Sequence, residues 1–160
     1  MVDDLTSQRG RLLFAPLGAF YARFQPASYA LLRFAFGLTM LTHGLPKLLG
    51  MPHGSMTDPM AGSIRLIDNV LHLPFAPMLA LLVALLETLG GLMVAIGLLT
   101  RPLAAMMAVQ MIFISLALGP TWPWIDRGIE YPVMLGFIAL LIALRGGGPA
   151  SLDRLIGREI

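Results

Sequence analysis

Residues 43 to 47 read HGLPK and place an imidazole and an ammonium four residues apart in an otherwise apolar stretch. Arg33 precedes them in the same stretch, and a lone carboxylate, Glu87, interrupts the next apolar stretch. Groups of these types can hydrogen-bond a carbonyl or hydroxyl ligand, and they can also exchange protons with it. They are the first candidates for a functional site.

The overall composition indicates the solvent in which these groups lie. Of 160 residues, 57% are hydrophobic and 12% are charged, and the mean hydropathy is +0.79. A soluble domain carries about 25% charged residues. The sequence therefore predicts an integral membrane protein, in which a buried charge costs at least about 2.5 to 3.5 kcal/mol and needs a partner.

Several classes of chemistry are excluded or disfavoured. The absence of cysteine excludes disulfides, thiolate-bound clusters and c-type haem attachment. The basic residues are scattered, which argues against nucleic acid as a partner. His43 is the one histidine expected inside the membrane, so bis-histidine haem is disfavoured, and His53 and His72 lack a carboxylate at metal-ligand spacing. We expect no metal site and no covalently bound cofactor.

Four apolar runs predict an all-α fold, a four-helix transmembrane bundle in a single domain spanning residues 1–160. Each run is close to the 17 to 25 residues that a spanning helix needs. Residues 1–26 are expected to form a cytoplasmic or interfacial amphipathic segment and residues 146–160 a cytoplasmic tail. We expect the second and third helices to form a short antiparallel hairpin. The predicted spans are 27–49, 73–99, 102–118 and 128–145.

The distribution of basic residues predicts the orientation. In a four-span protein, seven Lys and Arg residues flank one side and three flank the other, with Arg33 counted as intramembrane. The positive-inside rule then places both termini in the cytoplasm and residues 50–72 outside.

Helical spacing brings the candidate residues to two faces. At 100° per residue, Arg33, Gly37, Gly44 and Lys47 share one face of the first helix, with His43 beside it. On the second helix Glu87 and Gly91 share a face, with Gly90 next to it. Glycines permit close helix packing, so we expect both faces to point inward.

The expected result is a polar site that opens toward the outside. Counting 1.5 Å per residue from the cytoplasmic ends places Glu87 between Arg33 and His43 in depth. The same count places Lys47 level with Glu130, at the start of the fourth helix.

The motifs resemble the DoxX family over residues 27 to 156. LLRFAFGLTMLTHGLPKLLG is similar to the family's first helix, LLETLGGLMVAIGLLTRP to its second helix and Arg-Pro turn, GIEYP to the start of its fourth helix, and GGGPASLDRLI to its C-terminal motif. Pro46, inside HGLPK, departs from the family pattern. The family pattern falls on Arg33, His43, Gly44, Lys47, Glu87, Gly90, Gly91, Glu130 and Asp153.

This resemblance implies a bacterial inner-membrane protein linked to quinone-dependent redox or oxidative-stress systems. Three functions stay open. The chain could bind quinone or quinol and anchor a redox partner subunit, act as a noncatalytic scaffold or assembly factor, or provide a pathway for small molecules or protons. A homo-oligomer is compatible with the glycine-rich faces.

Each ionisable residue also has a structural alternative. Arg33 and Lys47 could reach the headgroups, and Glu87 could join helices. Glu130 could pair with Arg127, and Asp153 could cap the short tail helix.

Overall fold

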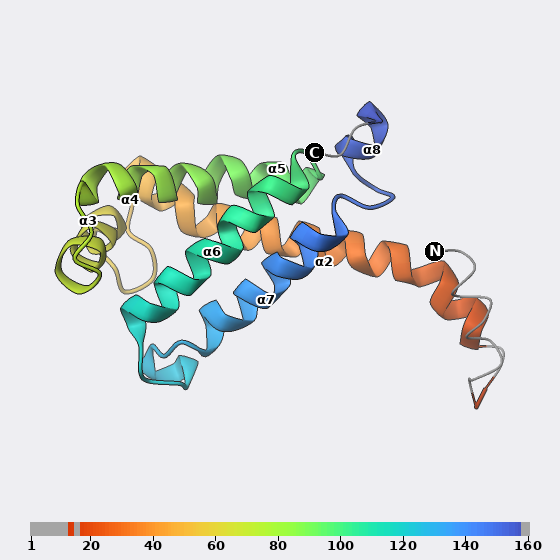
Figure 1. Cartoon of the computed structure of the whole chain (residues 1–160), viewed down its shortest axis with the longest axis horizontal. Coiled ribbons are helices and arrows are strands. Elements are labelled where there is room, and N and C mark those ends of the chain that lie inside the picture. Colours follow the sequence, from red (N-terminus) through yellow and green to blue (C-terminus); the bar gives the residue numbers. More distant parts are fainter. Residues whose placement is uncertain (1–12, 15–16, 158–160) are drawn as a thin grey trace.

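The computed structural model describes residues 13–14 and 17–157, and the regular elements in this part of the chain are helices (Figure 1). Four long helical segments correspond to the four predicted apolar runs. The helical elements are α2 (Leu17–Leu49), α3 (Pro59–Arg65), η2 (Leu66–Val70), α4 (Ala76–Leu85), η3 (Leu86–Gly90), α5 (Gly91–Ile96), α6 (Thr100–Leu118), η4 (Trp124–Asp126), α7 (Glu130–Arg145) and α8 (Leu152–Ile156).

Helix α2 begins at Leu17, ten residues before the predicted start at Ala27. Pro26 and Pro46 both lie inside this helix. A proline removes a backbone N–H and normally kinks or ends a helix, but α2 continues through both prolines, and its buried residues lie between them, from Tyr29 to Gly44. Residues 17–26 of the predicted interfacial segment therefore belong to α2. The rest of that segment, apart from residues 13–14, lies outside the described residues.

Two of the described segments are long and apolar enough to cross a membrane by themselves: Ala76–Ile96, with mean hydropathy 2.3, and Thr100–Leu118, with mean hydropathy 1.7. Helix α7 has 16 residues, fewer than the usual 17 to 25, and α2 carries Arg33, His43 and Lys47. The outward faces of the long helices expose many apolar side chains, among them Phe34 and Phe137. Such continuous apolar surface is expected where a protein faces lipid.

The helices pair in a different way from that predicted. Helix α2 packs along η3 and α5, and α6 packs along α7. The expected hairpin of the second and third helices has its tight turn, with Gly97 and Leu99 in the left-handed conformation. However, α5 and α6 diverge from this turn and share few contacts (Figure 1). A core of residues from α2, α5, α6 and α7, including Met40, Val94 and Met107, joins the two pairs.

Glycines set the distance between α2 and the second span. A Cβ on Gly37 would lie 2.5 Å from the backbone nitrogen of Ala95, and a Cβ on Gly44 would lie 2.6 Å from Cβ of Glu87. Gly91 faces the backbone of Gly37. Gly90 faces α6 instead, where an added Cβ would lie 3.1 Å from Met107 Cε. Gly37, Gly44 and Gly91 thus allow α2 and the second span to cross closely in an antiparallel direction. Gly90 allows α6 to approach the second span.

The C-terminal tail is folded against the end of the bundle where α2 enters. Asp153 accepts hydrogen bonds from the backbone N–H groups of Leu99 (2.8 Å) and Thr100 (3.0 Å). It therefore caps α6, not the short tail helix as was expected. Helix α8 is capped instead by Ser151, whose side chain accepts from the Arg154 N–H. Burial opposes ionisation of Asp153, but the hydrogen bonds from Thr100 and Leu99, together with the charge of Arg33, lower its pKa below the ordinary value.

We expect Gly37→Ala to destabilise the protein by about 1 to 3 kcal/mol, because the new methyl group meets the backbone of α5 rather than a movable side chain. The measurement is thermal unfolding of purified protein in detergent. Gly62→Ala is the matched control, since a Cβ at Gly62 in α3 meets nothing within 4 Å. Equal melting temperatures for the two variants would contradict the close crossing.

Candidate functional site

Glu87 lies at the centre of the bundle with 2% of its surface exposed. Its Oε2 pairs with Nζ of Lys47 at 2.6 Å, and its Oε1 accepts a hydrogen bond from Nε2 of Gln110, also at 2.6 Å. The three side chains come from η3, α2 and α6. We call Lys47, Glu87 and Gln110 the central cluster.

The backbone around Glu87 departs from a regular α-helix. Residues Leu86–Gly90 form a π-helical segment, η3, between α4 and α5. Single π-turns inside α-helices are rare and often occur at functional sites, because the wider turn shifts the side chains that follow it. Thr88, also in this segment, donates from Oγ1 to the carbonyl of Ala84 at 2.7 Å. This bond gives the Ala84 carbonyl a donor at the point where the regular α-helical hydrogen-bond pattern changes.

The pairing of Lys47 with Glu87 differs from the depth order predicted by counting from the helix ends. That count placed Lys47 level with Glu130. In the structure Gly44 packs directly on Glu87, so the register is shifted by about five residues, or roughly 7 Å. Helical side chains also lean toward the helix N-terminus, so Lys47 reaches back over the turn that contains Gly44.

Gln110 was not among the candidates found from the sequence. It is one neutral residue in a long apolar run, and the missed signal is that a buried amide in such a run needs a polar partner. Gln110 is 7% exposed, and with its Nε2 turned toward Glu87, its Oε1 accepts from no group in the described part of the chain. This leaves a buried acceptor beside the ion pair.

His43 lies toward the end of α2 and is half-buried. Its ring is 4.9 Å from the ring of His53, centroid to centroid, and 6.3 Å from that of Tyr131 at the start of α7. His43 thus lies beside the central cluster, on the same helix as Lys47, but its ring contacts reach the loop after α2. Sequence reasoning had placed His53 in that loop without a partner.

Arg33 lies apart from the central cluster, at the end of the bundle covered by the tail. It is 3% exposed and donates to the backbone carbonyls of Gly147, Ala150 (2.6 Å) and Ala95 (3.5 Å). The tail therefore provides the partners that its charge requires. Glu87 does not lie between Arg33 and His43 in a single site, although a role for Arg33 in ligand binding stays a prediction.

Glu130 also has a local partner. Its Oε2 accepts from the backbone N–H of Trp124 at 3.1 Å, within the connection between α6 and α7. Arg127, its proposed partner, donates instead to Oγ of Ser55 at 3.0 Å and so ties this connection to the loop after α2. A ligand role for Glu130 stays a prediction.

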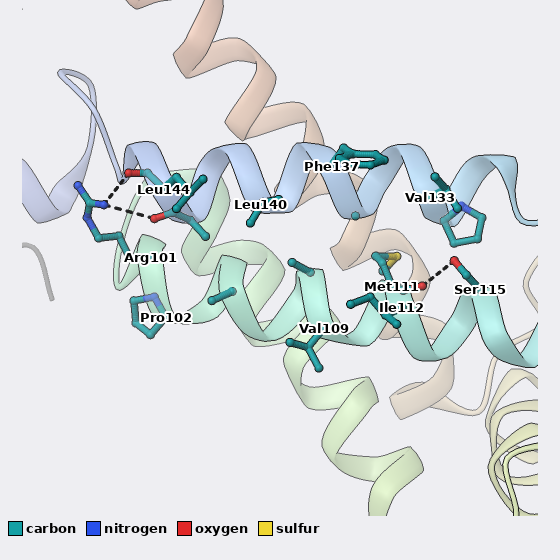
Figure 2. A pocket seen from close by; sticks show the side chains of 15 residues that line it. Arg101, Pro102, Val109, Met111, Ile112, Ser115, Val133, Phe137, Leu140 and Leu144 are labelled. Atoms are coloured by element: carbon teal, nitrogen blue, oxygen red, sulfur yellow. Dashed lines mark hydrogen bonds between the residues drawn. The ribbon is translucent and has the colours of Figure 1, made fainter.

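A separate apolar groove of about 870 Å³ runs between α6 and α7 (Figure 2). Met111, Val109 and Phe137 line it, and Arg101 closes one end by donating to the carbonyl of Leu144 at 2.7 Å. Ser115, at the other end, donates to the carbonyl of Met111. None of the central cluster lines this groove, so it is not the mouth of that site.

Comparison with known proteins supplies the family. The DoxX family model matches residues 28–119, which is more than half of the chain. The chain belongs to the DoxX family. No curated protein and no solved structure matches it. Together with the apolar helices, DoxX membership makes this a small membrane protein in contact with the lipid bilayer.

The matched region contains α2 from residue 28 onward, the second span and α6, and hence every residue of the central cluster. Within the described residues, no group of three or more His, Asp or Glu side chains is placed to hold a metal ion.

We expect Lys47→Met to destabilise this DoxX protein by about 3 to 5 kcal/mol, because it leaves the buried Glu87 carboxylate without a counter-charge. The double variant Lys47→Met/Glu87→Gln should recover most of that loss, since a neutral pair needs no compensation. The measurement is a double-mutant cycle on thermal unfolding. Additive losses in the double variant would show that the two side chains do not interact.

Proposed function

We propose that this DoxX protein spans the bacterial inner membrane four times, with both termini in the cytoplasm. The seven-to-three distribution of Lys and Arg supports this orientation. The 33-residue α2 is long enough to cross despite its charges, because Arg33 and Lys47 both have partners within the fold. The 16-residue α7 crosses with help from its packing on α6.

Because the chain has no cysteine, single substitutions test this topology directly. A membrane-impermeant maleimide should label Thr57→Cys in intact cells and should label Arg154→Cys only after the membrane is opened. Both positions are exposed. Labelling of Arg154→Cys in intact cells would contradict the orientation.

We further propose that the central cluster binds the ring of a quinone or quinol taken from the bilayer, in the service of a redox partner subunit. The observation that carries this proposal is the buried Oε1 of Gln110, an acceptor that lacks a donor within the described residues. A quinol hydroxyl supplies such a donor. Lys47, whose side chain is 13% exposed, has further N–H donors for a quinone carbonyl.

Glu87 gives the cluster its proton chemistry. Reduction of a quinone to a quinol takes up two protons with two electrons, and a carboxylate that contacts both Lys47 and Gln110 is positioned to take up a proton and relay it to a ring oxygen held by them. The chain needs no resident metal for this role, since the electrons come from the partner.

The alternative is a noncatalytic scaffold, and one observation favours it. Both carboxylate oxygens of Glu87 already have partners within the chain, so the cluster is able to join α2, η3 and α6 without any ligand. A scaffold predicts that substitutions in the cluster change stability alone. A ligand site predicts loss of ligand in variants that remain folded.

Binding of short-chain benzoquinone and naphthoquinone analogues, and of their reduced forms, to protein in nanodiscs distinguishes the two. We expect saturable binding to the wild type and at least about a tenfold loss in Gln110→Met and Glu87→Gln, because the first removes an acceptor for the ring hydroxyl and the second removes the charge that holds Lys47 and Gln110 in place. Asp68→Asn, which changes an exposed carboxylate in the outer loop, is the control. Binding should be compared at matched thermal stability. No binding to the wild type, or equal binding to all variants, would reject the quinone site and favour the scaffold.

A further inference from the structure

The two histidines that meet at the outer end of α2 have no part in the proposed quinone chemistry. His43 projects from α2 and His53 from the following loop, and their ring centroids are 4.9 Å apart with 62° between the ring planes. Both side chains are half-buried. The charged groups of the central cluster lie inward of them, and the loop side faces outward.

This spacing is close to that of two imidazoles that share one metal ion. A metal lies about 2.0 to 2.1 Å from an imidazole nitrogen, hence about 3.2 Å from the ring centre. Two rings bound to a three-coordinate ion, with an angle near 120° at the metal, then have centres roughly 5.5 Å apart. The observed separation of 4.9 Å is about 0.6 Å shorter, so the two rings have to move slightly apart to share an ion.

The loop supplies a third ligand of a different type. His53 and Met56 face each other across a small antiparallel bridge, in which each N–H donates to the carbonyl of the other at 2.9 and 3.0 Å. Residues opposite each other in such a pair project to the same side, with Cβ atoms about 4.5 to 5.5 Å apart. The thioether of Met56, which is 43% exposed, therefore lies on the same side of the loop as the His53 imidazole.

The loop is held in this position by contacts on both sides. Arg127 donates to Oγ of Ser55, which connects the loop to the segment before α7. The N–H of Met51 donates to the carbonyl of Pro46 at 2.9 Å and ties the start of the loop to α2. These contacts place His53 over His43 before any ligand binds.

We propose that His43, His53 and Met56 form a binding site for monovalent copper at the outer surface of the protein. Imidazole and thioether are the ligands that copper(I) accepts, and it is stable with two or three of them. Zinc prefers four ligands from Cys, His and carboxylates, and no third such side chain joins the pair within the described residues. The sequence alone predicted no metal site, because His53 and His72 lack a carboxylate at metal-ligand spacing, and it did not pair His53 with His43.

The test is anaerobic competition for copper(I) between the purified full-length protein in detergent and a chromophoric copper(I) chelator. We expect one ion per chain in the wild type, on the order of 100-fold weaker binding in His53→Ala, and about tenfold weaker binding in Met56→Leu. His72→Asn is the matched control, since His72 is exposed in the same outer segment and asparagine tolerates its positive φ of 51°.

Three outcomes overturn the proposal: no binding to the wild type, equal binding in His53→Ala and the wild type, or zinc bound as tightly as copper(I). X-ray absorption of the loaded protein should show nitrogen and sulfur neighbours, with the sulfur absent in Met56→Leu. His53 and Met56 lie in a loop away from the bundle core, so these variants are expected to remain folded. The quinone measurement uses other residues, so either proposal can fail while the other holds.

Discussion

The structure depends on keeping one carboxylate, that of Glu87, in the middle of an apolar bundle. An isolated charge there would cost several kcal/mol, so the fold has to bring a cation and a hydrogen-bond donor to it. Lys47 and Gln110 do so from two different helices, each at 2.6 Å. This one requirement links α2, the second span and α6, the three helices that the DoxX match covers.

Two backbone features make that contact possible. The glycine crossing brings α2 close enough that Gly44 lies directly against Glu87, and the π-helical segment turns Glu87 and Thr88 within the second span. At the opposite end of the bundle, Arg33 is satisfied by tail carbonyls, and Asp153 caps α6. The two sets of charged groups thus lie apart in the protein, and each leaves a buried polar atom without a partner among the described residues: Gln110 Oε1 beside Glu87, and Arg33 Nε beside the tail.

Periodicity and composition were enough to predict the all-helical fold, the central parts of the four long helices and the inward glycine faces, because these follow from local spacing. The helix register did not follow, since it depends on which glycine meets which residue across the crossing. The true start of α2 at Leu17 was also missed, because the residues before Ala27 were assigned to an interfacial segment. Contacts between residues distant in sequence were likewise not predicted. These are the contacts of Gln110 with Glu87, of His53 with His43, and of the tail with Arg33.

The central claim is that Glu87 is an ionised carboxylate held by Lys47 inside the bundle. Infrared difference spectroscopy of wild type against Glu87→Gln, in nanodiscs at neutral pH, measures this charge directly. The account predicts that the substitution removes a carboxylate stretching band and leaves the protonated carboxylic acid region unchanged. Loss of a protonated carboxylic acid band instead would show that Glu87 is neutral, and the ion pair on which this account of the site rests would be wrong.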